Sequence, residues 1–189
     1  NGTGTDQNLA EAVNWYLKAA EQGMANAQYN LALCYANATG VSHDPAQAMK
    51  WYLKAAEQGV LDAQYELAVC YAQGIGTSQN NYEAFKWYKK SAEQDIVDAQ
   101  YELAVCYAEG KGTARNDSEA AKWYLKAAEQ NVLDAQYQVA RCYAQGIGMS
   151  RNDLEAAKWF KKAAERNHAN AQYELAMCYA QGVGVPQND

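Results

Sequence analysis

The sequence predicts an all-α fold, a solenoid of about five helical hairpins with a 36-residue period. Five tryptophans are spaced by 36 residues: Trp15, Trp51, Trp87, Trp123 and Trp159. Self-similarity at a period of about 20 to 50 residues is typical of solenoids and propellers. Each period contains two runs with apolar residues at three- and four-residue spacing, such as 116–130 and 133–145, which indicates helices and not strands. Because each helix is apolar on one face only, the helices must bury that face by stacking on their neighbours.

The first helix of each period carries the tryptophan, and polar residues mark both of its ends. An Asn or Asp precedes the helix and a Glu or Gln follows three residues later, which is the pattern of a capping box. The pairs are Asn8 with Glu11, Asp44 with Gln47, Asn80 with Glu83, Asn116 with Glu119 and Asn152 with Glu155. Each helix should end at a residue that tolerates the left-handed conformation, and these residues are Gly23, Gly59, Asp95, Asn131 and Asn167.

The second helix of each period carries a cysteine. We expect it to begin behind an Asn or Asp that serves as N-cap or as first-turn carboxylate: Asn26, Asp62, Asp98, Asp134 and Asn170. It should stop at the first glycine of a Gly-x-Gly pair, such as Gly74 and Gly76. Since these pairs follow a helix and not a strand, turn geometry explains them better than a phosphate-binding loop does.

Two segments carry a resemblance to a known family. AQYELAVCYAQGIG (63–76) and AAKWYLKAA (120–128) are similar to the Sel1-like repeat, a relative of the tetratricopeptide repeat, and the similarity extends over essentially all of the chain. The resemblance implies a right-handed α/α superhelix in which the cysteine-bearing helix comes first in each repeat. This chain departs from the family in having alanine, as at Ala68, where glycine usually follows the leucine, but both residues are small enough for close helix packing.

The phase of the family divides the chain into a single solenoid domain over 1–189. We expect a lone helix at 8–22, four full repeats at 25–58, 61–94, 97–130 and 133–166, and a lone helix at 169–181. Solenoids normally close with polar capping repeats, and none is visible here. The sequence therefore suggests either a fragment of a longer protein or a designed, consensus-like array.

The cysteines and the apolar runs bear on the compartment. No apolar run is long enough to span a bilayer, so we expect no membrane insertion. Equivalent cysteines of adjacent repeats should lie about 8 to 10 Å apart, which exceeds the roughly 7 Å limit for a disulfide, and they are interpreted as buried thiols. One unpaired cysteine per repeat favours a reducing, cytoplasmic compartment.

The sequence offers little catalytic chemistry. Its two histidines, His43 and His168, occupy different phases of the repeat, and no Cys, His or carboxylate cluster has the spacing of metal ligands. His43 is interpreted as an exposed loop residue, because its neighbour Asp44 is needed as a helix cap. We expect no enzyme activity, no metal and no cofactor.

Charge separates the two kinds of helix. The cysteine-bearing helices hold seven carboxylates and one base, whereas the tryptophan-bearing helices are close to neutral, so nearly all of the net charge of −6 lies on one set. By resemblance to tetratricopeptide solenoids, the first helices line a concave groove. The predicted groove residues are Tyr29, Tyr65, Glu66, Val69, Tyr101, Glu102, Val105, Tyr137, Gln138, Arg141, Tyr173, Glu174 and Met177. The alternative is that these tyrosines pack between repeats and the acids only keep the surface soluble.

These features predict a non-catalytic protein-interaction scaffold or adaptor that binds a peptide or a partner helix in this groove. The partner should carry apolar and basic residues, and an acidic groove disfavours nucleic acid. One alternative is an engineered or structural repeat array without a specific ligand, whose uncapped ends could associate head to tail between molecules. Another alternative is a hydrolase, for which the sequence provides no nucleophile motif.

Overall fold

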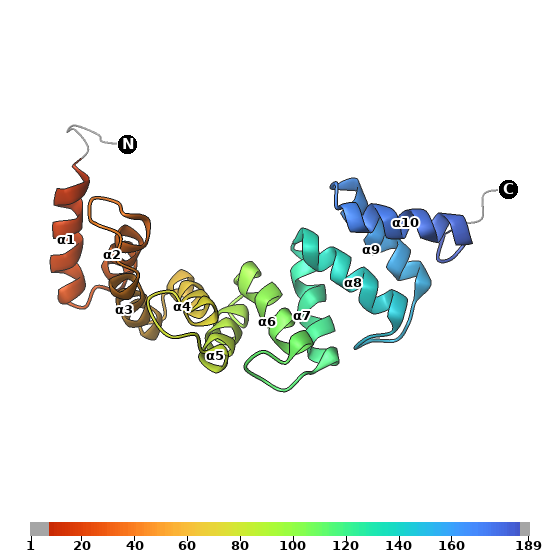
Figure 1. Cartoon of the computed structure of the whole chain (residues 1–189), viewed down its shortest axis with the longest axis horizontal. Coiled ribbons are helices and arrows are strands. Elements are labelled where there is room, and N and C mark those ends of the chain that lie inside the picture. Colours follow the sequence, from red (N-terminus) through yellow and green to blue (C-terminus); the bar gives the residue numbers. More distant parts are fainter. Residues whose placement is uncertain (1–7, 186–189) are drawn as a thin grey trace. The chain divides into compact units, whose positions relative to one another are not determined.

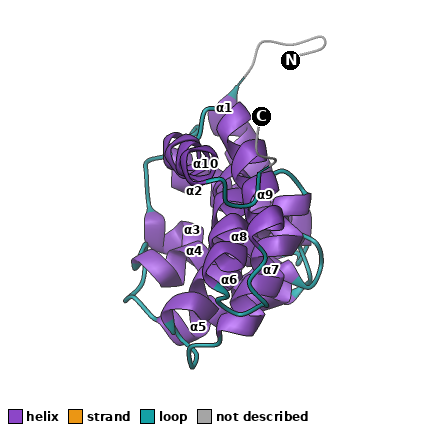
Figure 2. Ribbon diagram, turned by 90° about the vertical axis from the view of Figure 1, so that its right-hand side faces the viewer, coloured by secondary structure: helices purple, strands orange, loops and turns teal. Residues whose placement is uncertain are grey.

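The computed structural model describes residues 8–185 of the 189-residue chain, and this part consists of ten α-helices and no strand (Figure 1). Their bounds are α1 Leu9–Glu21, α2 Ala25–Asn37, α3 Pro45–Glu57, α4 Leu61–Gln73, α5 Asn81–Ala92, α6 Val97–Glu109, α7 Asp117–Glu129, α8 Leu133–Gln145, α9 Asp153–Glu165 and α10 Ala169–Gln181. Figure 2 shows the same helices joined by loops alone. The predicted all-α fold of repeating helical hairpins is confirmed.

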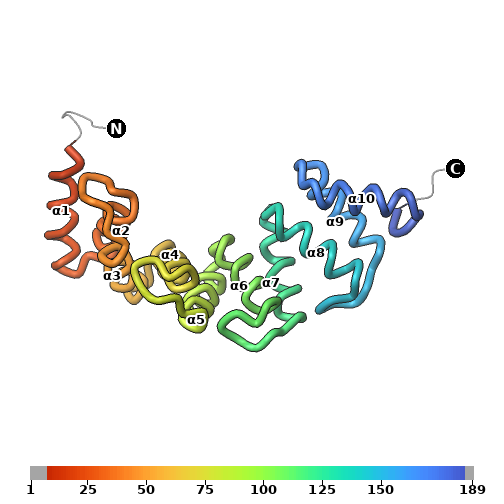
Figure 3. Tube along the Cα trace, viewed as in Figure 1, coloured from red at the N-terminus to blue at the C-terminus, as the bar shows by residue number. Residues whose placement is uncertain are grey.

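The helices fall into two compact units. Unit 1 covers Asn1–Gln94 and contains α1 to α5, and unit 2 covers Asp95–Asp189 and contains α6 to α10. Within each unit every helix packs on the helix before it and the helix after it along the chain, a succession that can be followed in Figure 3. Packing between sequence neighbours is the property that defines a solenoid.

Small side chains let the helices approach closely in each unit. In unit 1 the core residues Leu31, Ala32, Ala55 and Ala56 are fully buried beside the aromatic ring of Tyr52. Unit 2 repeats the arrangement around Val139 and Tyr124. The alanine that replaces the usual glycine after the leucine is fully buried in the first four cysteine-bearing helices, so a small residue is required there by packing.

The predicted capping boxes are half present. Each Asn or Asp cap accepts a hydrogen bond from the backbone N–H three residues on, as in Asn80 Oδ1 to Glu83 at 3.2 Å. The return bond from the Glu side chain was predicted wrongly. The N–H of Asn80 donates instead to the carbonyl of Tyr71 at 2.8 Å, which leaves the Glu83 carboxylate to pair with Lys86 at 3.0 Å.

The predicted N-caps of the second helices were also wrong, although their first-turn position was right. The N-cap residues are Met24, Val60, Ile96, Val132 and His168. In the first four connections this residue is apolar, and at Val60 its backbone serves both helices, whereas the His168 side chain accepts a hydrogen bond from the N–H of Ala171. The N–H of Val60 closes the end of α3 by donating to Ala55, and the carbonyl of Val60 already accepts the first bond of α4 from Gln64. Asp62 therefore lies inside the first turn, where its charge favours the helix N-terminus.

The predicted helix ends are confirmed. Gly23, Gly59, Asp95, Asn131 and Asn167 all have a positive φ, between 65° and 91°. The second glycine of the Gly-x-Gly pairs has a further requirement. At Gly76 a Cβ atom would collide with the backbone carbonyl of Pro45, so the loop can pass the start of α3 only without a side chain.

Candidate functional site

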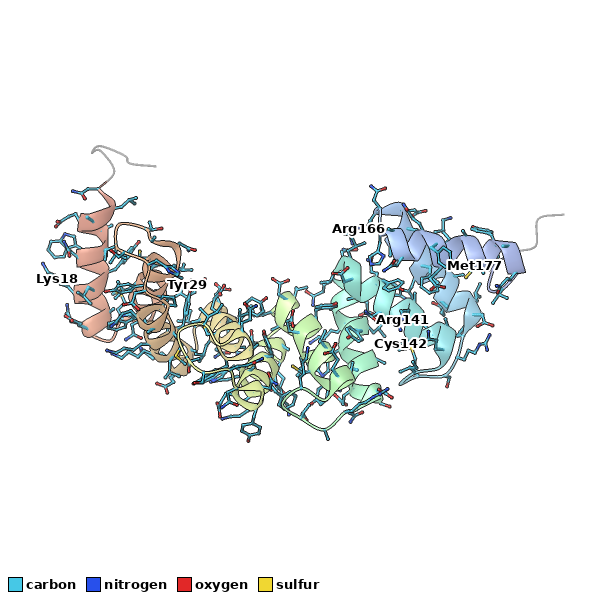
Figure 4. All side chains as sticks on the ribbon, in the orientation of Figure 1. Lys18, Tyr29, Arg141, Cys142, Arg166 and Met177 are labelled. Atoms are coloured by element: carbon cyan, nitrogen blue, oxygen red, sulfur yellow. The ribbon has the colours of Figure 1, made fainter. Side chains whose placement is uncertain are left out.

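The predicted groove residues of unit 1 lie on α2 and α4, where each tyrosine ring packs on an aromatic ring of the next helix. Tyr29 contacts Tyr52 and Tyr65 contacts Tyr88, with ring centroids 6.0 Å apart in both pairs and tilted planes. Both groove tyrosines remain half-buried. Figure 4 labels Tyr29 on α2. The rings therefore serve in stacking and still offer part of their surface to solvent.

Unit 2 repeats this arrangement on α6, α8 and α10. The ring centroids of Tyr101 and Tyr124 are 5.7 Å apart, and those of Tyr137 and Phe160 are 6.0 Å apart. Tyr173 on α10 is 66% exposed. The tyrosine row is thus partly covered wherever the next tryptophan-bearing helix supplies an aromatic partner.

Carboxylates lie beside these tyrosines in both units. In unit 1, burial raises the pKa of the Glu66 carboxyl, and the negative charge of Asp62 raises it further. The pKa of the Tyr29 hydroxyl on α2 is also raised, first by burial and then by the negative charges of Asp62 and Glu66 on α4. In unit 2, burial raises the pKa of the Glu102 carboxyl, and the positive charge of Lys111 partly offsets this rise.

These half-buried carboxylates have no cation close enough to form an ion pair. Within residues 8–185, no Lys, Arg or His nitrogen lies within 4.0 Å of Glu66 or Glu102. Some carboxylates on the tryptophan-bearing helices differ in this respect, since Glu83 and Glu155 each pair with a lysine. A positive charge supplied from outside would therefore relieve Glu66 and Glu102 more than the paired surface acids.

The third row of predicted residues is apolar except at one position. Val69 and Val105 are half-buried, Met177 is 36% exposed, and Arg141 takes the equivalent place on α8. One guanidinium N–H of Arg141 donates to Gln138 Oε1 at 3.2 Å, and its guanidinium carbon lies 5.9 Å from the centre of the Tyr137 ring. Figure 4 shows Arg141 and Cys142 together on α8.

Two pockets adjoin these rows, one in each unit. The first, here called pocket I, has a volume of about 200 Å³ and is lined by Ala36, His43, Pro45, Ala48, Tyr52, Glu66, Val69, Cys70 and Ile75. The second, pocket II, has a volume of about 150 Å³ and is lined by Ala108, Arg115, Asp117, Ala120, Tyr124, Gln138, Arg141, Cys142, Gln145 and Ile147. Each pocket thus combines a cysteine-bearing helix with the hairpin that precedes it.

The thiols at these pockets are poor nucleophiles. All five cysteines are free, and the prediction of buried thiols holds for four of them, whereas Cys178 is only half-buried. Burial raises the pKa of the Cys70 thiol in pocket I to about 11 and also raises the pKa of the Cys142 thiol in pocket II, so both are protonated at neutral pH. Nowhere in residues 8–185 do three or more His, Cys, Asp or Glu side chains form a group that could hold a metal ion. None of the helices in this range has the length and apolar content that a bilayer crossing requires.

The sequence patterns and this geometry agree with the comparisons with known proteins. The family model described as "Sel1 repeat" matches residues 1–24, 25–60, 61–96, 97–132, 133–168 and 169–189. The chain belongs to the Sel1 repeat family. Members of this family are commonly protein-interaction scaffolds and are typically non-catalytic.

Several solved structures resemble the chain. A protective antigen present in uropathogenic Escherichia coli strains, which displays an SLR fold, is 40% identical with a TM-score of 0.90 over 99% of this chain, and the chain spans 40% of that protein's length. A Sel1 repeat protein from Oxalobacter formigenes is 37% identical with a TM-score of 0.79, covering 99% of this chain and 75% of that one. Cysteine rich protein B of Helicobacter pylori is 25% identical with a TM-score of 0.54, covering 70% and 96%. The comparison with curated proteins gave no match.

Sequence reasoning missed a buried glutamine in four of the Sel1 repeats. In unit 1, Gln64 is fully buried, its Nε2 donates to the carbonyl of Ala56 at 3.3 Å, and its Oε1 accepts from Gln94 Nε2 at 2.8 Å. Gln28, Gln100 and Gln136 are equally buried. The sequence does show a glutamine that recurs every 36 residues at this position. The role of Gln64, however, depends on partners eight and thirty residues away in the chain.

Sequence reasoning also missed a row of lysines over the tryptophans. In three copies the ammonium group of the lysine that follows the tryptophan by three residues lies close to the centre of the tryptophan ring. The distances are 4.0 Å for Lys18 and Trp15, 4.2 Å for Lys54 and Trp51, and 4.2 Å for Lys162 and Trp159. Such cation–π contacts contribute about 0.5–1 kcal/mol at exposed sites. A Trp-x-x-Lys column in the sequence would have indicated them, because residues three apart share a helix face.

Proposed function

We propose that this Sel1 repeat chain is a non-catalytic scaffold that binds a peptide or a partner helix along the predicted groove residues of each unit. The observation that carries the proposal is the combination of half-exposed tyrosine rings with half-buried, unpaired carboxylates. Tyrosine offers a large apolar ring with one polar end and is enriched among the residues that dominate binding energy. A partner with apolar and basic side chains would cover the rings and neutralise Glu66 or Glu102.

Selection from a peptide library tests this proposal directly. A random peptide library displayed on phage is selected on the immobilised chain, and we expect enriched sequences that combine Lys or Arg with aromatic or aliphatic residues. The double substitution Tyr101→Ala with Glu102→Lys should weaken binding of peptides that use unit 2. The control is Glu129→Lys, which makes the same charge reversal at an exposed position of α7. If every enriched peptide binds both variants equally, the groove residues are assigned wrongly.

A second candidate function is self-association through surfaces at the two ends of the described helices. Trp15 and Met24 are 59% and 61% exposed and line a pocket of about 420 Å³ on α1 and α2. In unit 2 the equivalent Trp159 packs against the hairpin that precedes it. A second copy presenting the exposed Tyr173 and Tyr179 of α10 could cover Trp15 in the same way. Light scattering over a concentration series, with Trp15→Ser as the variant, tests this candidate, and a constant monomer mass would refute it.

A further inference from the structure

Pocket I and pocket II occupy the same place in the repeat and carry opposite charge. Every residue that lines pocket I has its counterpart two periods of 36 residues later in pocket II, which adds Gln145. The enclosing residues are alike, since buried Tyr52 corresponds to Tyr124 and buried Cys70 corresponds to Cys142. The two pockets are therefore equivalent cavities of the repeat that differ in some of their lining side chains.

The differences that matter are on the cysteine-bearing helix. Pocket I has the unpaired carboxylate of Glu66 and the apolar Val69, whereas pocket II has the amide of Gln138 and the guanidinium of Arg141. A net negative pocket in unit 1 thus corresponds to a net positive pocket in unit 2.

Arg141 is the cation that pocket II leaves available. The other arginine in its lining, Arg115, is held by a two-point contact with Asp117, at 2.8 and 3.1 Å. Arg141 uses one N–H on Gln138, although a guanidinium has five, and among residues 8–185 no carboxylate lies within 4.0 Å of it. Its planar fork matches the two oxygens of a carboxylate.

Pocket size and local charge restrict the chemical class of ligand that pocket II can bind. Both pockets are smaller than the roughly 300–1,000 Å³ of small-molecule sites, so each suits one side chain or one chain end. Asp117 also lines pocket II and would repel a dianionic phosphate more strongly than a singly charged carboxylate. The geometry points to a carboxylate on a peptide.

We propose that pocket II binds a carboxylate group of the peptide partner through Arg141, while the equivalent pocket I favours a basic or apolar side chain. This inference rests on the proposed peptide-binding function and defines its partner more closely, as a segment with an acidic group in addition to basic ones. The carboxylate can come from an Asp or Glu side chain or from the C-terminus of the partner.

The experiment compares peptide selections on the wild-type chain and on a double variant, Gln138→Glu with Arg141→Val, which places the pocket I residues at these two positions of pocket II. Both new residues occur at the same position of other repeats, so the variant should fold, and circular dichroism checks this. We expect an acidic position among peptides enriched on the wild type and its loss on the double variant. The control, Lys122→Gln, removes one positive charge from an exposed site of α7 and should leave the acidic position enriched.

Synthetic versions of the enriched peptides then identify the carboxylate. With an amidated C-terminus, replacing the acidic residue by its amide, or Arg141 by Val, should weaken binding about 10- to 100-fold, as expected for loss of a charge-assisted hydrogen-bonded contact. Loss of binding on amidation alone would assign the site to a C-terminal carboxylate. Tighter binding of a phosphoserine peptide, or binding unaffected by Arg141→Val, would overturn the inference and leave the groove proposal standing. If the wild type enriches no peptide at all, both fail.

Discussion

Replacing Gln64 by glutamate should destabilise the α3–α4 pair strongly. The side chain is fully buried, and its Nε2 donates to the carbonyl of Ala56 at 3.3 Å while its Oε1 accepts from Gln94. Gln64→Glu keeps the shape of the side chain but replaces the donor with a charged oxygen that faces a carbonyl oxygen. An uncompensated buried charge of this kind costs about 3–5 kcal/mol.

A matched control exists on α10. Gln172 has the same repeat position and donates the same bond, to the carbonyl of Ala164 at 3.1 Å, but its side chain is exposed. Gln172→Glu should therefore cost only about 0.5 kcal/mol, the usual size of a surface substitution. The difference between the two variants isolates the cost of burial.

Amide hydrogen exchange measures the opening free energy of each helix and does not require two-state unfolding, which repeat proteins often violate. The cost of Gln64→Glu should depend on pH. Burial raises the folded-state pKa of the new carboxyl above its unfolded value of about 4.3, so the penalty is absent below that pH and grows as the pH rises to the folded pKa. Equal losses in Gln64→Glu and Gln172→Glu, or a penalty that persists at pH 3, would refute this reasoning.

Three further predictions follow from single residues. Ser91 Oγ is buried and, among the described residues, has no hydrogen-bond partner, and the other copies have alanine at this position. Ser91→Ala should therefore raise the unfolding free energy by about 1 kcal/mol, and an unchanged or lower melting temperature would contradict this prediction. The pKa of Glu66 is raised by burial and by Asp62, so ionised Glu66 opposes folding, and Glu66→Gln should stabilise the chain at pH 7 but not at pH 3. If urea denaturation shows a higher unfolding free energy for this variant at both pH values, the stabilisation comes from packing and not from charge. His168 Nδ1 accepts a hydrogen bond from the Ala171 N–H at 3.1 Å, so His168→Ala should lower the protection of α10 against amide hydrogen exchange by about 1 kcal/mol. His168→Asn should restore this protection, and failure of the asparagine to do so would exclude a capping role.

The site was predictable only where one helix face determined it. The groove residues were found because tyrosines and carboxylates recur on one stripe of the cysteine-bearing helices. Whether the rings stack or stay exposed was left open, and the structure shows both, since Tyr29 packs on Tyr52 and is still half-buried. The binding role of this stripe remains a proposal.

The sequence by itself determined the period, the helices and most of their ends. A helix cap such as Asn80 depends on a bond to a residue three positions on, and the left-handed residue Asn131 depends on its own backbone, so both can be recognised locally. Where an end depended on another element the sequence prediction was wrong, as at Val60, which closes one helix and opens the next.

Only the tertiary structure decided which side chains meet. Gln64 joins residues eight positions before and thirty positions after it, and pocket II brings Arg141 together with Arg115 and Tyr124 from the preceding hairpin. Distances of this kind depend on how closely two helices approach, which is set by small buried residues such as Ala56 and not by the residues of the site. A 36-residue repeat therefore reveals which positions are equivalent, whereas helix packing decides what each position contacts.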